Sequence, residues 1–302
     1  MSIIKRLLLS LLALLVMAVI GLSLFTFKAV KGFPFYEREP IELPAIIDSV
    51  QHSRILLFSK TNAYRHGDAI EGGNMIITQI AREMGHYIFT TESAGIYNPE
   101  QLSLFDLVIW NNVSGKVLTR EQRAIFQSYL LDGGVLVALH AAGDFSHQWD
   151  WYEEECIGAP FSHHPLDPQI QEGRLYKSKS IDSTFDDLAS EFILSDEWYV
   201  FDNVPDSNFT VLYRLDESGL SMNGNLPILI KDKNYGMGSD HPIVWYRTIG
   251  EGKVFYSALG HTAASFQHPE HQRLLESAIN WGLKDPDIPL LTSTPIDSTV
   301  TQ

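Results

Sequence analysis

Four apolar segments of this sequence are each followed by side chains that can bind a ligand or transfer a proton. They are Tyr64, Arg65 and His66 after residues 54–59, Asn111 after 107–110, His140 at the end of 135–140, and His261 after 253–259. Imidazole has an ordinary pKa close to neutrality and is also the commonest metal ligand in proteins. The pattern therefore indicates acid–base chemistry, a metal site or a polar binding pocket.

A second group of candidates lies between residues 149 and 240. It contains the histidine pair His163 and His164, and the sequence SDEWYVFD, which carries Glu197 and Tyr199. Imidazole and carboxylate suit zinc, manganese or iron, although no HExxH spacing is present. A histidine paired with a buried carboxylate would equally suit proton transfer. The remaining alternatives are binding without catalysis, and histidines that merely satisfy the core.

Several chemistries are excluded by what the sequence lacks. There is no GxSxG motif, and Ala141 and Ala142 occupy the turn after residues 135–140, where a nucleophile would stand. No GxxxxGK[ST] or GxGxxG motif occurs, so we expect no nucleotide cofactor. The single cysteine, Cys156, permits no internal disulfide. The formal net charge of −15 argues against nucleic acid as a partner.

Strand-like and helix-like segments alternate along most of the chain. Apolar runs predict strands at 54–59, 87–91, 107–110, 135–140 and 253–259. Helices are predicted at 69–84, 120–132 and 269–281. A capping box from Thr119 to Gln122 opens the second of these helices. This alternation predicts an α/β sandwich of three layers with a mostly parallel sheet. Ligands bind at the carboxyl ends of such strands, which is where the candidate residues gather. The segment from about 149 to 240 breaks the rhythm, and we expect it to fold over that end.

Aromatic residues are frequent in and around this inserted segment: Trp149, Trp151, Tyr152, Trp198, Tyr199 and Trp245. Flat rings beside polar groups suit the C–H face of a sugar. Core packing explains the same residues equally well.

The N-terminus carries an uncharged apolar stretch from Leu7 to Phe27, long enough to cross a bilayer. Lys5, Arg6 and the amino terminus precede it, while Lys28 and Lys31 follow it. This small excess of positive charge before the stretch favours a domain outside the cytoplasm, periplasmic or extracellular. A cleaved signal peptide is the alternative. We expect a transmembrane anchor over 1–27, a linker over 28–52 that lets the domain stand clear of the bilayer, an α/β domain over 53–284 and a disordered tail over 285–302.

Several fragments together resemble the ThuA-like (trehalose-utilisation) family: KTNAYRHGDAI, GGVLVALHAAGDF, SHHP, DEWYVFD and GKVFYSALGH with the helix after it. The resemblance covers about Arg54 to Leu283. It implies a flavodoxin-like fold similar to class I glutamine amidotransferases, without their cysteine chemistry. It also implies a role in carbohydrate metabolism, including oxidised (keto) saccharides as substrates. The resemblance further places nine residues in the pocket: Tyr64, Arg65, His66, His140, His163, His164, Glu197, Tyr199 and His261.

The leading hypothesis is an enzyme, a lyase, hydrolase or isomerase, acting on a small saccharide. We expect His66, His261 and Glu197 to be catalytic, and His140 to orient the others or to bind a divalent metal. The expected substrate-binding residues are Tyr64, Arg65, Asn111, His163, His164 and Tyr199. The alternative is a non-catalytic extracytoplasmic sugar-binding protein on the same fold.

Overall fold

The central feature of the protein is a nine-stranded sheet in the order β2-β1-β3-β4-β11-β10-β9-β6-β7. In this computed structural model of the 302-residue chain, residues 3–30, 32–178, 182–222 and 235–284 are described. The first five strands in that order are parallel: β2 (Tyr87–Thr91), β1 (Arg54–Phe58), β3 (Leu107–Asn111), β4 (Val135–Leu139) and β11 (Gly252–Ser257). Their order is that of flavodoxin-like folds, the fold that the family resemblance implied.

The inserted segment does more than cover one end of the sheet, because most of its strands extend the sheet sideways. Antiparallel pairing adds β10 (Pro242–Ile249), β9 (Thr210–Asp216), β6 (Ile170–Lys177) and β7 (Glu191–Glu197). Two short strands, β5 (Phe161–His163) and β8 (Val200–Phe201), form a separate pair. The apolar sequence LPILI at 226–230, which favours a strand, lies outside the described residues, as does the tail predicted over 285–302.

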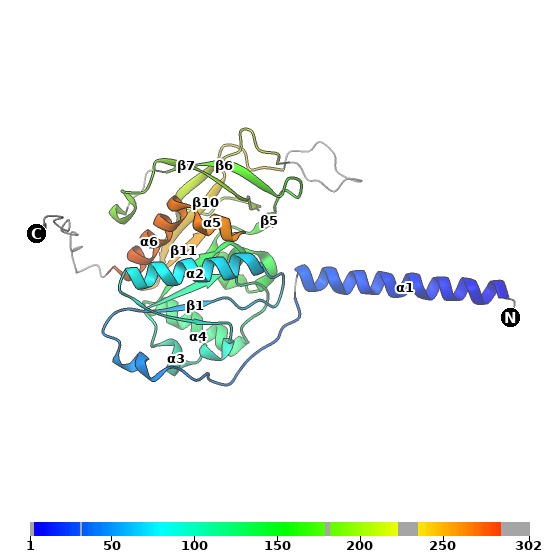
Figure 1. Cartoon of the computed structure of the whole chain (residues 1–302), viewed down its shortest axis with the longest axis horizontal. Helices are drawn as coiled ribbons and strands as arrows, with labels where there is room; N and C mark the ends of the chain where they lie inside the picture. Colours follow the sequence, from blue (N-terminus) through cyan, green and yellow to red (C-terminus); the bar gives the residue numbers. More distant parts are fainter. Residues whose placement is uncertain (1–2, 31, 179–181, 223–234, 285–302) are drawn as a thin grey trace, which may run out of the picture.

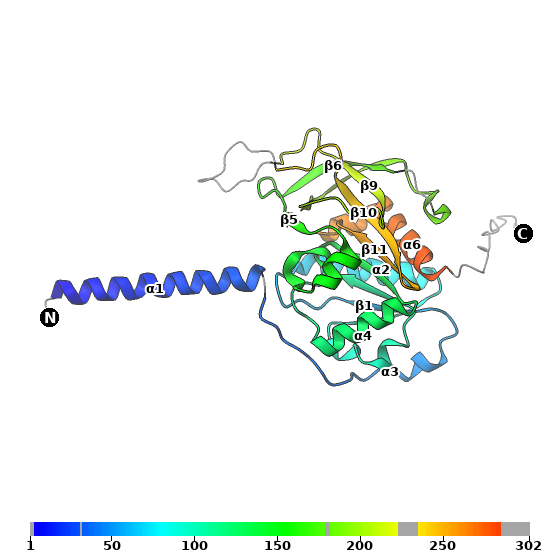
Figure 2. The same cartoon turned by 180° about the vertical axis from the view of Figure 1, so that it is seen from behind.

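Helices cover both faces of the parallel half. In Figure 1, α2 (Gly67–Glu83), α5 (Ala263–Gln267) and α6 (Pro269–Leu283) lie in front of the sheet, and in Figure 2 the opposite face shows α4 (Arg120–Leu131) with α3 (Pro99–Leu102). The predicted capping box at Thr119 and Gln122 is present at the start of α4. Because β3 and β4 are buried along their whole length between these layers, their apolar runs show no alternation. The fold is therefore the predicted three-layer α/β sandwich.

The segment expected to be a linker packs against the domain. Glu37 forms an ion pair of 2.7 Å with Lys60, and the side-chain amide of Asn62 donates to the carbonyl of Phe35. Further along, Gln101 of α3 bonds both backbone groups of Ile41, and Ile47 is buried in the core. We call residues 32–49 the strap, because they cross the α3–α4 face from the carboxyl edge of the sheet to its amino edge.

The N-terminal helix α1 (Ile3–Val30) projects alone from the domain, on the side of β5 (Figures 1 and 2). Residues 3–27 of it are long and apolar enough to cross a membrane, and none of this span is buried against the protein. It has the character of a membrane anchor or signal sequence.

Most of the aromatic residues considered for sugar contact belong to the core. Trp198 and Trp245 are fully buried and donate their indole N–H groups to the carbonyls of Gln171 and Ile157. Tyr152 is also fully buried and bonds the carbonyl of Ala142. Buried Trp and Tyr residues pair their polar atoms in this way, so these three rings pack the core and are closed to a ligand.

Candidate functional site

Four candidate residues from four different parts of the chain meet at the carboxyl edge of the sheet. His66 precedes α2, His140 follows β4, Glu197 ends β7, and His261 follows β11. One ligand atom from each lies within 4.8 Å of the others. His66, His140 and Glu197 are buried, and His261 keeps some exposure. We call these residues the His/Glu cluster.

Three ligand atoms of the cluster form a compact triangle. Nε2 of His140 lies 3.1 Å from Nδ1 of His261 and 3.3 Å from Oε2 of Glu197, and the latter two atoms are 3.1 Å apart. Two ligand atoms held about 2.1 Å from one tetrahedral ion stand about 3.4 Å apart. The triangle thus has the dimensions expected for three ligands of one small divalent cation.

The protons of neutral histidines cannot satisfy this triangle. Nδ1 of His140 lies 2.8 Å from the carbonyl oxygen of Ala258, so the neutral ring carries its proton there and donates it to that carbonyl. Nε2 then presents a lone pair to the Glu197 carboxylate. If neutral His261 carries its proton on Nδ1, the contact between Nε2 of His140 and Oε2 of Glu197 still joins two acceptors. Either an added proton on His140 or a cation among the three atoms removes the repulsion.

The electrostatics of the cluster match this arrangement. Burial opposes a charge on His140, but the hydrogen bond and charge of Glu197 outweigh it and raise the pKa of His140 above its usual value. Burial also opposes the carboxylate of Glu197, yet its bonds with His140 and His261 hold the pKa of Glu197 well below its usual range. The site therefore presents an ionised carboxylate that attracts positive charge.

His66 completes the cluster as a neutral ring. Burial, together with the nearby His140 and His261, lowers the pKa of His66 to about 2. Its buried Nδ1 has no hydrogen-bond partner among the described residues. A buried polar atom without a partner is uncommon in folded proteins and calls for a bound ion, water or ligand.

The backbone at the end of β4 has a left-handed turn, and its central residue is His140. The φ angle of His140 is 49°, a conformation that costs a residue with a side chain roughly 1–3 kcal/mol. From the sequence we placed this turn at Ala141 and Ala142, so the position is corrected by one residue. The chemical conclusion is unchanged, because an imidazole, and no serine or cysteine, stands there.

A buried carboxylate ties two elements of the cluster together. Asp196 accepts hydrogen bonds from the backbone N–H groups of Gly260 and His261, at 2.8 and 3.0 Å, and from the hydroxyl of Ser265 at 2.6 Å. It also accepts from the N–H of Glu197. Because Asp196 joins the end of β7 to the loop after β11, it sets the positions of Glu197 and His261 relative to each other.

The remaining oxygen of Glu197 has partners of its own. Oε1 accepts a hydrogen bond of 2.6 Å from Gln169 and lies 3.1 Å from Nδ1 of His164. The ring of Tyr199 packs against the ring of His140, with the ring centres 4.2 Å apart. His164 and Tyr199, expected to bind substrate, thus surround the cluster directly.

The other expected residues lie at different distances from the chemistry. Tyr64 is more than half exposed and touches His66 edge-on, with the ring centres 4.8 Å apart. Arg65 forms an exposed ion pair with Glu92. Asn111 uses its side chain within the core, donating to Asn74 of α2. His163 lines a separate hollow of about 410 Å³ near Tyr235.

Sequence reasoning missed Asp196, Gln169 and Ser265. Asp196 stands beside Glu197 in SDEW, but neighbours on a strand point to opposite faces, so adjacency gave no reason to group them. Its role depends on N–H groups more than 60 residues away along the chain. No local pattern reports such a contact.

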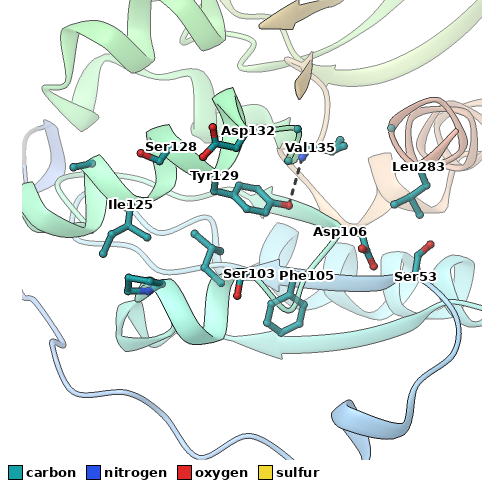
Figure 3. A pocket seen from close by; sticks show the side chains of 16 residues that line it. Ser53, Ser103, Phe105, Asp106, Ile125, Ser128, Tyr129, Asp132, Val135 and Leu283 are labelled. Atoms are coloured by element: carbon teal, nitrogen blue, oxygen red, sulfur yellow. Dashed lines mark hydrogen bonds between the residues drawn. The ribbon is translucent and has the colours of Figure 1, made fainter. Parts of the chain in front are cut away.

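A second cavity lies at the opposite, amino edge of the sheet. It has a volume of about 810 Å³, and its wall includes Ser103, Asp106, Ser128, Tyr129 and Leu283 (Figure 3). The hydroxyl of Tyr129 bonds the backbone of Val135 across it. Among the described residues, no histidine or cysteine lines this cavity, and open α/β sheets bind ligands at the other edge. We therefore place the candidate site at the cluster.

Comparison with known proteins agrees with the fold and the family. The family model for ThuA, described as trehalose utilisation, matches residues 54–282. A ThuA-like protein from Bacteroides uniformis is 23% identical, with a TM-score of 0.62 over 77% of this chain and 92% of that chain. Another from Parabacteroides merdae is 17% identical, with a TM-score of 0.58 over 77% and 90%. No curated protein matches the sequence.

The fold and the family match together define an α/β sandwich protein with a carbohydrate-related role. This chain belongs to the ThuA (trehalose utilisation) family.

Proposed function

We propose that this protein is a divalent-metal-dependent enzyme acting on a small saccharide, with the metal held by His66, His140, Glu197 and His261. The observation that carries the proposal is the triangle of His140, Glu197 and His261 atoms, which neutral histidines beside an ionised Glu197 leave unsatisfied. Membership of a family named for trehalose utilisation supports a saccharide as the substrate class.

Each residue of the site has a distinct task in this proposal. A bound divalent cation would supply Lewis acidity toward a carbonyl or hydroxyl oxygen and would acidify a bound water. The carbonyl of Ala258 holds His140 in the tautomer that frees Nε2. Gln169 and His164 fix the orientation of Glu197. The partly exposed side chains of His261 and His164 leave the approach for substrate on their side.

Substrate contact falls to the residues that surround the cluster. The exposed ring of Tyr64 offers a flat apolar surface next to His66, suited to the C–H face of a sugar ring. His164 offers a partly exposed polar edge for hydroxyl groups. An oxidised saccharide, with its carbonyl oxygen, would give a bound cation a group to polarise, which accords with the class the family suggests.

A metal-free acid–base enzyme is the second candidate, favoured by the raised pKa of His140. In that case His140 would carry the added proton in an ion pair with Glu197, and His261, the more exposed partner, would exchange protons with substrate. The two candidates use the same residues but differ in metal content.

We also propose that the apolar helix stays attached as an anchor, with the domain outside the cytoplasm. The support is its length and the pair Lys5 and Arg6 before it.

Metal content separates the candidates. Untagged full-length protein purified in detergent micelles should contain about one equivalent of zinc, manganese or iron by mass spectrometry. His140→Ala and His261→Ala should lose it, because each removes a ligand. His147→Ala, a buried histidine of the same loop outside the cluster, should retain it. Metal-free wild type that still turns over a saccharide would establish the acid–base candidate instead.

A further inference from the structure

The anchor helix joins the domain at the same edge as the His/Glu cluster. Gly32 donates its N–H to the carbonyl of Phe27, 3.1 Å away, so Gly32 lies against the last turn of α1. Gly32 has a φ of 71°, and its Cα abuts the backbone of Asn62 so closely that any Cβ would overlap the Asn62 carbonyl. Asn62 follows β1 and precedes His66 by four residues.

The covalent path from membrane to site is therefore short. Four residues span at most about 14 Å when fully extended, which bounds the backbone separation of Asn62 and His66. The headgroup layer on each side of a bilayer is about 5–8 Å thick. If the apolar helix ends at the hydrocarbon boundary, the edge that carries the cluster lies just outside the headgroups.

The strap holds the chain that follows the anchor to this edge of the domain. Phe35 and Glu37 are bonded to Asn62 and to Lys60, both of which follow β1, and Glu37 also accepts from the N–H of Ala94 after β2. The first strap residues are thus fixed to the carboxyl edge. Figures 1 and 2 both show β5, which leads into His164, on the side of the domain from which α1 leaves.

The surface beside the end of the anchor is aromatic. The exposed fractions are 49% for Phe33, 67% for Phe35 and 54% for Tyr64. Aromatic side chains concentrate at membrane–water interfaces, where apolar and polar surroundings meet. We call Phe33, Phe35 and Tyr64 the membrane-facing edge.

We propose that the membrane-facing edge contacts the headgroup region of the bilayer that holds α1, and that the site takes saccharide headgroups of membrane lipids. This proposal rests on the proposed saccharide function and on the retained anchor. A protein and a lipid-linked sugar on the same surface meet at a high effective concentration. The contact is aromatic, and the formal charge of −15 makes an anionic surface a poor partner, so neutral bilayers suit it.

A depth measurement tests the contact without using activity. The test variant is Phe35→Cys, and the matched control is Ser128→Cys at the amino-edge cavity. Both are labelled with bimane, which reacts at the introduced cysteine because the native Cys156 is buried. The full-length variants are placed in phosphatidylcholine vesicles containing a lipid with a nitroxide headgroup. We expect quenching at position 35 at least about three times that at 128, because only the former lies within the headgroup layer. Equal quenching overturns the proposal.

Binding in the same vesicles tests the substrate class. The probes are a diacylglycerol that carries a glucose disaccharide and the same disaccharide free in solution. We expect an apparent Kd at least about tenfold lower for the lipid-linked probe, and a loss of that preference when about 12 flexible Gly/Ser residues are inserted before Gly32. Equal affinity of the wild type for both probes overturns the lipid-linked substrate.

The two levels of proposal fail in different ways. If His140→Ala binds both probes as wild type does, or wild type binds neither, the saccharide function of the cluster is wrong, while the quenching result still decides the bilayer contact. Recovery of the chain from cells in soluble form without residues 1–27 would overturn the bilayer contact and leave the metal and sugar measurements to decide the function.

Discussion

At the scale of single residues, the cluster depends on proton positions as much as on residue types. The carbonyl of Ala258 takes the Nδ1 proton of His140 and thereby turns Nε2 toward Glu197. Metal ligands in proteins commonly have such outer partners, which fix the tautomer and the ring orientation. His140 and Glu197 thus each have an outer partner that helps determine which atom faces the centre.

Asp196 is the outer partner whose removal should be most informative. Asp196→Asn keeps the size of the side chain but replaces one acceptor oxygen by a donor, which cannot accept the N–H groups of Gly260 and His261 together with the Ser265 hydroxyl. We expect Co²⁺ affinity to fall about 10- to 100-fold and the visible spectrum of the cobalt-loaded protein to change. Isothermal titration and absorption spectroscopy measure both.

The control for this substitution is Asp106→Asn. Asp106 also accepts a backbone hydrogen bond, from Arg54, but at the amino edge. The Asp106→Asn substitution should leave the spectrum of the cobalt-loaded protein unchanged. Ser265→Ala, which deletes one of the four bonds to Asp196, should give a smaller loss of affinity. An Asp196→Asn protein with wild-type affinity and spectrum would show that Asp196 has no positioning role.

At the scale of elements, the left-handed turn at His140 is the feature that brings a strand end into the site. It lets the ring of His140 stand above the edge of the sheet and leaves Ala141 and Ala142 buried in the turn that follows. Backbone strain of this kind persists where the surrounding structure holds it, and such positions cluster at functional sites.

The strap is the second element with a measurable consequence. The Lys60 side chain is only 7% exposed, so Glu37→Ala would leave a nearly buried ammonium group without its carboxylate. Because Glu37 itself keeps 30% exposure, we expect a loss of about 2 kcal/mol in unfolding free energy, less than for a fully buried pair. Urea unfolding of the full-length protein in detergent micelles measures it.

The neighbouring ion pair between Arg65 and Glu92 is the matched comparison. Both side chains are more than 40% exposed, so Arg65→Ala should cost less than about 0.5 kcal/mol. Equal losses for Glu37→Ala and Arg65→Ala would mean that the strap contributes no more to stability than a surface contact.

At the scale of the whole molecule, the anchor decides which compartment the site serves. The residues Lys5 and Arg6 before the apolar stretch favour an N-terminus inside the cell. Protease added to spheroplasts that contain the full-length protein should therefore degrade the α/β domain. The double substitution Lys5→Glu, Arg6→Glu leaves the basic side chains Lys28 and Lys31 on the other side of the stretch, reverses the charge bias and should increase the protected fraction. A domain fully protected in the wild type would place the site in the cytoplasm.

Much of this architecture follows from local sequence pattern. The five parallel strands, the helices α2, α4 and α6, and the apolar N-terminal helix were all predictable, because each is encoded by an apolar run, a helical spacing or a cap within a short window. The same holds for the excluded chemistries, since a serine or cysteine that is absent at the turn after β4 cannot react. The gathering of His66, His140 and His261 at one edge followed from the geometry of parallel sheets.

Only the tertiary structure decided the distances between residues that are far apart in sequence. Glu197 belongs to a strand at the outer edge of the extended sheet, and only the tertiary fold brings its carboxylate 3.1 Å from His261. The bonds of Asp196, and the strap contact that joins Lys60 to Glu37, are likewise long-range. Sequence determined which chemical groups this protein has and on which elements they stand. Packing determined which of their atoms meet, because hydrogen bonds between distant segments leave no periodic trace in the chain.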